Sequence, residues 1–447
     1  MSRQQIASAG SLSVAAISIA ASLWMERIDW TQSPILPLGT LTIIQYSLLA
    51  LCMVGYWNAG PKTNNWKDYR ALLAVAIVAR LALIPINPYT SNDIDRYLFD
   101  GKVALSGYDP YRLNHNDPLL SQLRQEWATP EEHAKYPTLY PPGALGLFAS
   151  AAASGPQFAE ISWKIMSALA GIAFLLVMVC LLKRVNKLRH LSLVALSPLL
   201  IFETGVGAHV DIFSALAIAV ALLFWQQDKL AHTGIALGVG ALIKLVPALL
   251  LVPLCFGQSS FKRFFTIGLP AMLMIITGYS VAFALGMHPI GSTPVFFEKW
   301  RNAAPVFDVL NTYIKDKDLL YLIIAILIFT LCLIAYKSWR IQANKTRETI
   351  KYMQISIAIP LLLSPVVFPW YLLPLAPLFA LQPNAFLAAW FVLLPFTYEV
   401  LNQFACCDNW APQQWPVTLL AIGLAAGFSI DRWLFYKRTQ CLKKGYA

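Results

Sequence analysis

The chain has 447 residues, of which 57% are hydrophobic and 13% charged, and its formal net charge is +11. Soluble domains carry about 25% charged residues, so the composition excludes an ordinary soluble domain and predicts an all-α polytopic membrane protein. The positive charge does not indicate nucleic acid as a partner, because basic residues of membrane proteins gather in cytoplasmic loops.

Apolar runs of a length that can span a hydrocarbon core, roughly 18–20 residues, recur along most of the chain. We therefore expect one integral membrane domain over residues 1–447, a bundle of about 12–14 transmembrane helices. The helices are expected at 8–25, 35–57, 69–86, 160–182, 190–204, 211–226, 230–244, 246–257, 264–287, 319–337, 352–367, 369–381, 385–401 and 415–436. Ser8–Met25 lacks a strong basic region, which favours a retained first helix over a signal peptide. The runs at 190–204 and 246–257 are short, which indicates broken helices that face a cavity.

The distribution of charge predicts the orientation of the bundle. The intervals 58–70, 183–189, 258–263, 337–351 and 437–444 are rich in Lys and Arg, whereas the opposite loops hold most of the acids. Because basic loops lie in the cytoplasm, we expect both termini there and the acidic loops on the outer face, in the periplasm for a bacterial inner membrane. ATP and nucleotide sugars are not normally available on that face, so neither is expected as the direct substrate.

The longest polar interval, residues 87–159, is expected to be a catalytic external loop, and residues 288–318 a second external loop. Within the first, residues 94–106 are expected to form a helix that lies in the membrane interface. Its apolar side would carry Ile94, Tyr97, Leu98 and Leu105, and Asp95, Arg96, Asp100 and Lys102 would face elsewhere. Residues 141–153 are too short for a confident span and are interpreted as a second interfacial helix.

Asp93 and Asp95, near the start of this loop, are the first candidates for chemistry. A carboxylate can act as a general base towards a hydroxyl group within hydrogen-bond reach. The same residues could instead cap a helix, because acids in a first helical turn are favoured by the helix dipole. The spacing alone leaves both interpretations open.

Further candidates lie at the expected outer ends of helices. His209 and Asp211 could bind a sugar, orient a substrate, ligate a metal or simply cap a helix. Lys244 follows a long uncharged apolar run, and Lys164 lies one turn inside its helix, so each could be functional or could snorkel to the interface. Arg301, in the second external loop, could be a solvated charge or could hold a phosphate together with these lysines.

The remaining candidates are aromatic residues and cysteines. Trp370 and Tyr371 could stack on a sugar or belong to the aromatic belt of the membrane interface. Tyr140, before two prolines, would alone indicate only a helix start. The seven cysteines show no metal-binding spacing, and the adjacent Cys406 and Cys407 are expected to be two thiols rather than a vicinal disulfide.

Six motifs combine these candidates. They are SNDIDRYLFDGKVALSGYDPY (91–111), TLYPPGALGLF (138–148), GAHVDIFSALAIAVALLF (207–224), GIALGVGALIKLVPALLLVPL (234–254), FFEKWRNAAPVF (296–307) and SPVVFPWYLLPLAPL (364–378). In this order they resemble the GT-C superfamily of polyprenyl-phosphate-sugar-dependent glycosyltransferases, and most closely its bacterial mannosyltransferase-like branch. The Asp-Ile-Asp also resembles the DxD motif of GPI mannosyltransferase I.

The resemblance implies a GT-C-like bundle that transfers a hexose, expected to be mannose, from a polyprenyl-phosphate carrier to a hydroxyl of a lipid or glycan acceptor. The transfer would invert the sugar at the outer face, with Asp93 as base and Asp95 as helper. His209 and Asp211 match the family's GH(V/N)D pattern, except that Ala208 replaces its usual neighbour. Substrate binding is expected from Arg96, Tyr140, Lys164, His209, Asp211, Lys244, Trp300, Arg301, Trp370 and Tyr371.

The chain departs from the family pattern at a second position. Phe368 stands where relatives often have His, and members differ in metal dependence, so no cofactor is assigned and a divalent metal stays open. A transporter or flippase of lipid-linked sugars is the main alternative, although paired midplane charges in inverted repeats, which would favour it, are not evident. The sequence is also compatible with a structural subunit of an envelope-assembly complex and with a ligase that moves whole glycans.

Overall fold

The computed structural model describes residues 3–30, 37–127, 134–292, 298–314, 316–341 and 346–444, together with 129 and 295. In this part of the chain every regular element is helical, and one isolated bridge joins Asn302 to Val366. The first residues of the helix expected at 35–57 and parts of both expected external loops lie outside the described residues. The prediction of an all-α fold is confirmed.

Seven helical stretches among the described residues are long and apolar enough to cross a membrane. They are α1 (Arg3–Met25), α2 (Leu38–Ala59), α8 (Ala159–Arg184), α14 (Phe261–Ala284), α17 (Asp316–Ile341), α22 (Gln414–Lys444) and the continuous run of α20 (Ala385–Leu393), η7 (Leu394–Val400) and α21 (Leu401–Cys407). A helix of 22 residues is about 33 Å long, which matches a hydrocarbon core of about 30 Å. The chain is an integral membrane protein, and the larger number of crossings stays a prediction.

The other helices are shorter. They are η2 (Trp66–Tyr69), α3 (Arg70–Ala82), α4 (Asp93–Leu105), η3 (Pro118–Leu120), α5 (Ser121–Arg124), α7 (Pro142–Ala152), η4 (Leu188–His190), α11 (Asp211–Gln226), α12 (Leu230–Ile243), α16 (Pro305–Tyr313) and α18 (Thr346–Leu362).

Three apolar stretches are interrupted helices. The first is α9 (Ser192–Ala195) followed by α10 (Pro198–Gly205), the second is η5 (Val246–Leu250) followed by α13 (Leu251–Phe256), and the third is η6 (Pro369–Leu375) followed by α19 (Ala376–Leu381). The breaks predicted at 190–204 and 246–257 are therefore confirmed. The third break falls in the stretch expected as one helix at 369–381. It follows from Pro369, Pro374 and Pro377, because each proline removes a backbone donor that an α-helix needs.

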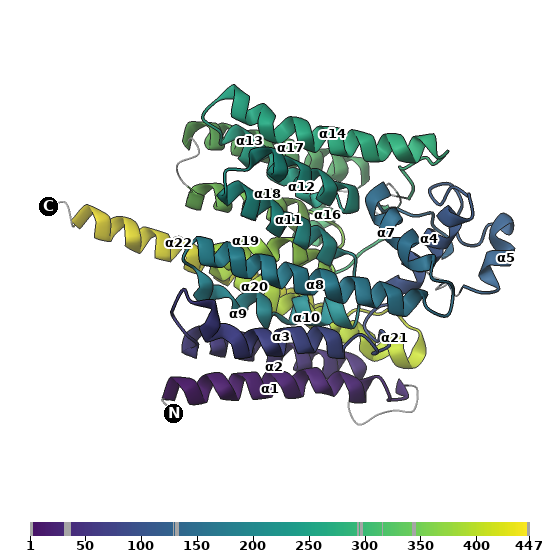
Figure 1. Cartoon of the computed structure of the whole chain (residues 1–447), viewed down its shortest axis with the longest axis horizontal. Helices are drawn as coiled ribbons and strands as arrows, with labels where there is room; N and C mark the ends of the chain where they lie inside the picture. The colour runs from purple at the N-terminus through teal and green to yellow at the C-terminus, as the bar shows by residue number, and fades with distance from the viewer. Residues whose placement is uncertain are drawn as a thin grey trace.

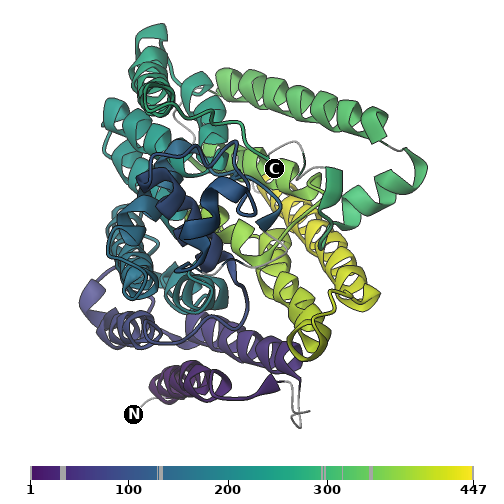
Figure 2. The same cartoon turned by 90° about the vertical axis from the view of Figure 1, so that its right-hand side faces the viewer.

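The helices run side by side, and the polar segments collect at one end of the bundle (Figure 1). That end carries α4, α5 and α7, whereas the start of α1 and the last turns of α22 lie at the opposite end. Figure 2 looks onto the polar end, where the dark blue segment around residue 100 lies across the middle of the bundle. The candidates of the first external loop are thus brought over the ends of helices that are distant in sequence.

Helix α4 is packed tightly against α7. A Cβ atom on Gly101 would lie 2.4 Å from the backbone carbonyl carbon of Phe148, so the two helices approach at a distance that only glycine allows. The ring of Tyr97 stacks on the ring of Phe148 with their centroids 4.5 Å apart, and it meets Trp163 of α8 edge-on at 5.5 Å. This contact holds the first turn of α4 in place.

The other side of α4 corrects the sequence analysis. Leu105, expected on the apolar side, is half exposed, whereas Arg96 and Asp100, expected to face elsewhere, are buried. The reason is that the chain following α4 folds back over it and supplies polar partners. The Arg96 guanidinium donates to the carbonyl oxygen of Pro137 at 3.1 Å, and Asp100 Oδ1 lies 2.7 Å from His115 Nε2.

The close approach at Gly101 predicts a specific loss of stability. Gly101→Ala is expected to destabilise the protein by about 1–3 kcal/mol, because the added methyl group has no space between the two backbones. Gly146→Ala on α7 is the matched control, since its Cβ would meet nothing within 4 Å. Thermal unfolding in detergent should show a lower midpoint for the first variant only, and equal midpoints for both would contradict the packing described.

Candidate functional site

A cavity of about 1100 Å³ lies at the polar end of the bundle. It is lined by Leu38 and by residues from the stretches 26–30, 87–96, 135–141, 244–246, 299–301, 368–371 and 401–412. Eight of the predicted site residues line it, namely Asp93, Arg96, Tyr140, Lys244, Trp300, Arg301, Trp370 and Tyr371. The structure therefore brings together residues that the sequence separates by almost 300 positions.

Asp93 is the first residue of α4, directly after the N-cap residue Asn92. The backbone N–H of Asp93 donates to Ser91 Oγ at 3.2 Å, so Ser91 provides local support for the helix start. The carboxylate itself is engaged elsewhere. Tyr97 donates its hydroxyl hydrogen to Asp93 Oδ2 at 3.3 Å, and His209 Nδ1 lies 3.3 Å from the same oxygen. The side chain is 14% exposed, on the cavity wall.

His209 lies behind this wall and is fully buried. The loop before α11 turns sharply at Ala208, which has a positive φ of 44°, and the His209 N–H donates to the carbonyl oxygen of Glu203 at 2.8 Å. The imidazole stacks on Trp370 with ring centroids 3.7 Å apart, and Trp370 also stacks on Phe368 at 4.5 Å. Trp370 thus supports His209, and Phe368, at the position where relatives often have His, extends the stack.

Glu203 on α10 was not singled out by the sequence analysis. Its side chain is fully buried, and Oε2 lies 3.4 Å from His209 Nε2. Its other oxygen, Oε1, accepts hydrogen bonds from the hydroxyls of Tyr46 at 2.9 Å and Tyr398 at 2.6 Å. An acid within an apolar helix was the available signal, because such a residue in a membrane protein is functional by default.

Lys244 ends α12 in an extended conformation and points into the cavity wall. Its ammonium group pairs with Oδ1 of the buried Asp211, the first residue of α11, and lies 4.2 Å from the ring centroid of Tyr371. The Lys244 side chain is 21% exposed, so part of it remains accessible from the cavity. Asp211 therefore orients a cation at the site rather than lining the cavity itself.

The second external loop contributes Trp300 and Arg301. The Arg301 guanidinium donates to the carbonyl oxygen of Trp300 at 2.7 Å and lies over the ring of Phe307 at 4.9 Å. The neighbouring Asn302 is tied to the stretch before η6, because its carbonyl oxygen accepts from the Val367 N–H at 2.9 Å. This backbone hydrogen bond positions Arg301 at the cavity, beside Trp370.

The charge of the lining is mainly positive. The basic lining residues are Arg96, Lys135, Lys244, Lys299 and Arg301, and the acidic ones are Glu26 and Asp93. Lys135 and Lys299 were not among the predicted site residues. An excess of five cations over two carboxylates favours an anionic ligand in the cavity.

Residues 4–257 match the model of a protein family described as alpha-(1->6)-mannopyranosyltransferase, N-terminal domain. The chain belongs to this family. The matched region extends over more than half of the chain and includes Asp93, Glu203, His209 and Lys244. Comparison with curated proteins and with solved structures gives no match. The resemblance to the bacterial mannosyltransferase-like branch of the GT-C superfamily is confirmed, and the protein is a membrane glycosyltransferase.

Four predicted site residues of this mannosyltransferase family member do not line the cavity, and two of them, Asp95 and Lys164, also lie apart from the contacts that His209 and Asp211 make with Asp93 and Lys244. Asp95, two positions after Asp93 on α4, points to a different side of the helix, next to Glu160. Lys164 on α8 is buried, and its ammonium group has no hydrogen-bond partner among the described residues. Neither side chain lines the cavity, so the geometry does not bring them to Asp93.

The surroundings of Asp95 predict a pH-dependent stability. Burial, followed by the nearby Glu160, raises the pKa of Asp95 from 3.8 to about 6. The folded glycosyltransferase therefore holds this proton more tightly than the unfolded chain, and folding becomes less favourable as pH rises from about 4 to above 6. Asp95→Asn should raise the melting temperature at pH 7.5 and leave it unchanged near pH 3.5. An equal difference at both pH values would contradict this environment.

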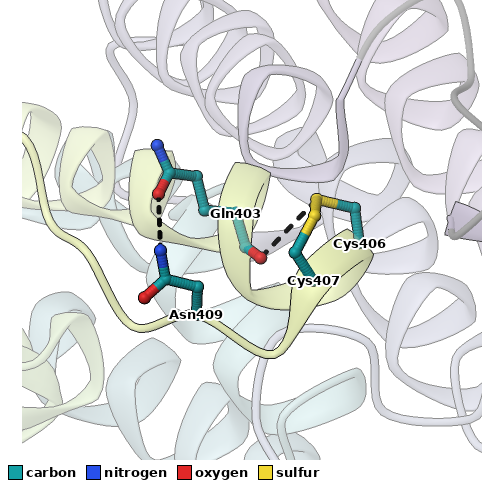
Figure 3. The surroundings of a disulfide bond; sticks show 4 residues. All are labelled: Gln403, Cys406, Cys407 and Asn409. Atoms are coloured by element: carbon teal, nitrogen blue, oxygen red, sulfur yellow. Dashed lines mark hydrogen bonds between the residues drawn. A yellow bond between two sulfur atoms is a disulfide. The ribbon is translucent and has the colours of Figure 1, made fainter.

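One of the helices that line the cavity, α21, ends at a disulfide. Phe404 on α21 lines the cavity, and the helix ends with Cys406 and Cys407, whose sulfur atoms are bonded to each other (Figure 3). The chain then returns, with Asn409 donating its side-chain amide to Gln403 Oε1 at 3.1 Å. The expectation of two thiols is therefore wrong. Both sulfur atoms lie on the same side of the last turn of α21, where they can join, and sequence adjacency alone did not reveal this.

His209 and Asp211, which the sequence analysis considered as metal ligands, do not face a common site. The structure turns His209 towards Asp93 and Glu203, and it pairs Asp211 with Lys244. Within the described residues, no group of three or more His, Cys, Asp or Glu side chains is arranged to hold a metal ion.

Proposed function

We propose that this protein transfers mannose from a polyprenyl-phosphate carrier to the 6-hydroxyl group of an acceptor sugar, with inversion at C1 and with Asp93 as the base. The observation that carries the proposal is the Asp93 carboxylate in the wall of a cavity that five basic side chains and one other acid, Glu26, also line. The α-(1→6) linkage is taken from the name of the family.

Lys244 and Arg301 are the proposed ligands of the donor phosphate. Lys244 is held by Asp211, which removes much of the conformational freedom that a lysine would otherwise lose on binding. Arg301 offers a planar guanidinium, which binds phosphate through two parallel hydrogen bonds, whereas an ammonium group binds it as a point charge. Together they can neutralise a phosphate that carries a sugar on one oxygen and a prenyl chain on another.

The prenyl chain of the carrier is proposed to leave the cavity beside Lys244. The next residue, Leu245, lines the cavity and is 60% exposed, which places an apolar surface directly next to the cation. Val246 continues this surface at the start of η5. A carrier whose phosphate contacts Lys244 could therefore keep its chain in the bilayer, where its apolar surface is not exposed to water.

The proposed reaction is a single displacement. The acceptor oxygen forms a bond to C1 on the face opposite the phosphate, and its proton moves to the Asp93 carboxylate. The bond between C1 and the phosphate oxygen breaks, and its electron pair stays on the released polyprenyl phosphate. Lys244 and Arg301 stabilise the charge that grows there. Inversion to an α-linked product requires a donor in which mannose is β-linked.

The site is proposed to face the outer side of a bacterial inner membrane, with both termini in the cytoplasm. Basic residues lie at helix ends away from α4, such as Lys183 and Arg184 at the end of α8 and Arg340 at the end of α17. Positive residues of this kind favour the cytoplasmic side. The cavity would then open where lipid-linked sugars, and not nucleotide sugars, are available.

The test is a transfer assay with the purified protein in detergent. The probes are a synthetic β-mannosyl phosphate of a short prenol and an α-mannoside with a free 6-hydroxyl. We expect one α-(1→6)-linked mannose per molecule of prenyl phosphate released. Neither product would form with a transporter or a structural subunit, so the absence of both would reject the proposed function.

A further inference from the structure

A line of three titratable side chains runs from the cavity wall into the bundle. Asp93 on α4 stands at its outer end, His209 in the middle and Glu203 on α10 at its inner end. The separations are 3.3 Å from Asp93 Oδ2 to His209 Nδ1 and 3.4 Å from His209 Nε2 to Glu203 Oε2. Within the described residues neither imidazole nitrogen makes a hydrogen bond, and each lies at ion-pair distance from one of the two carboxylates.

Glu203 is held by residues of two other elements. Tyr46 of α2 and Tyr398 of η7 both donate to Oε1, and these residues lie 157 and 195 positions away from Glu203 in the sequence. The side chain is fully buried in an otherwise apolar helix. A carboxylate in such a place costs free energy, and replacing buried ion pairs by apolar residues is often neutral for stability. A packing role alone therefore gives little reason for an acid here.

We propose that Glu203 is a positioning residue for mannosyl transfer, which holds His209 and through it sets the orientation of the Asp93 carboxylate towards the acceptor hydroxyl. The inference rests on the proposed function, in which Asp93 is the base. Glu203 does not line the cavity and exchanges no proton with the substrate. Its carboxylate fixes which edge of the imidazole faces inward, so that Nδ1 faces Asp93. Trp370, stacked on the ring, prevents tilting but not rotation in the ring plane.

The test compares Glu203→Gln with the wild type in the transfer assay. The variant is expected to lower kcat by about 10- to 100-fold, because displacement of a reacting group by about 1 Å can cost roughly 100-fold. The KM values for donor and acceptor should stay within about twofold, since Glu203 touches neither. Glu399→Gln is the matched control, because Glu399 is another buried acid, on η7. Its carboxylate accepts from the Gln413 N–H and does not contact His209. This control should keep its kcat.

A double-mutant cycle tests whether Glu203 acts through His209. His209→Asn keeps an amide donor that can face Asp93 but removes the contact with Glu203. Adding Glu203→Gln to that variant should change kcat by less than about twofold, because residues that act as one unit are not additive. A full additional loss would show that Glu203 acts by another route and would overturn the inference.

The remaining outcomes separate the two proposals. Transfer by the wild type, loss of it in Asp93→Asn and full kcat in Glu203→Gln would overturn the role of Glu203 and leave the function standing. No transfer by the wild type would overturn both. Should Glu203→Gln not fold, Tyr46→Phe combined with Tyr398→Phe removes the hydroxyl donors without changing the charge. A lower kcat with unchanged KM is then expected, and unchanged kcat would overturn the inference.

Discussion

Asp93→Asn is expected to lower the turnover of mannosyl transfer by about 100-fold or more while the protein still inserts and folds. General-base help from a well-placed carboxylate typically contributes about 10²–10⁴-fold, and an amide cannot accept the proton. The change preserves size, so the hydrogen bond from Tyr97 and the packing beside His209 can be kept. The measurement is kcat of the purified variant, alongside its melting temperature.

Asp117→Asn provides the control for this first prediction. Asp117 lies in the same loop, away from the cavity, and its carboxylate accepts from the Leu119 N–H at the start of η3, a role that Asn can also fill. It should retain wild-type turnover. Near-normal transfer by the Asp93 variant would remove the carboxylate from the reaction, whatever the behaviour of the control.

Lys244→Ala is expected to raise the KM for the donor by about tenfold or more and to change the KM for the acceptor much less. A hydrogen bond to a charged group contributes about 1.5–3 kcal/mol, which corresponds to roughly 10- to 150-fold in affinity. The variant also leaves the buried Asp211 without the cation that pairs with it, so its folding has to be checked separately by thermal unfolding.

Lys102→Ala is the matched change for this second prediction. Lys102 is a cation on α4 that lies over the ring of Trp127 and does not line the cavity. The Lys102→Ala variant removes one positive charge from the same end of the protein, and it should leave the KM values for donor and acceptor unchanged. Equal donor KM values for the wild type and the folded Lys244 variant would exclude Lys244 from the phosphate site.

The helical fold could be predicted because long apolar runs admit few other structures in a bilayer. The breaks at 190–204 and 246–257 could be predicted from their length alone. The polar side of α4 could not, because the partners of Arg96 and Asp100 come from a later part of the loop that folds back. Periodicity reports which side of a helix is apolar, and it does not report which polar side chains are paired and buried.

The site, like the fold, could be predicted in part. Asp93, Lys244 and Arg301 stand out in an apolar chain, and the structure brings all three to one cavity. Asp95 and Lys164 carry the same kind of signal, but the turn of their helices directs them elsewhere. Glu203 is also an acid in an apolar helix, but its role depends on contacts with residues up to almost 200 positions away. The local sequence around Glu203 does not indicate these contacts.

The most direct test of the central claim, that Asp93 is the base at a lipid-phosphate site, is an experimental structure with a non-transferable phosphonate analogue of the donor. We expect the phosphonate oxygens within about 4 Å of the Lys244 ammonium group and the Arg301 guanidinium, with C1 of mannose facing the Asp93 side of the cavity. An analogue bound with its phosphonate away from both cations, or with C1 facing away from Asp93, would contradict the account.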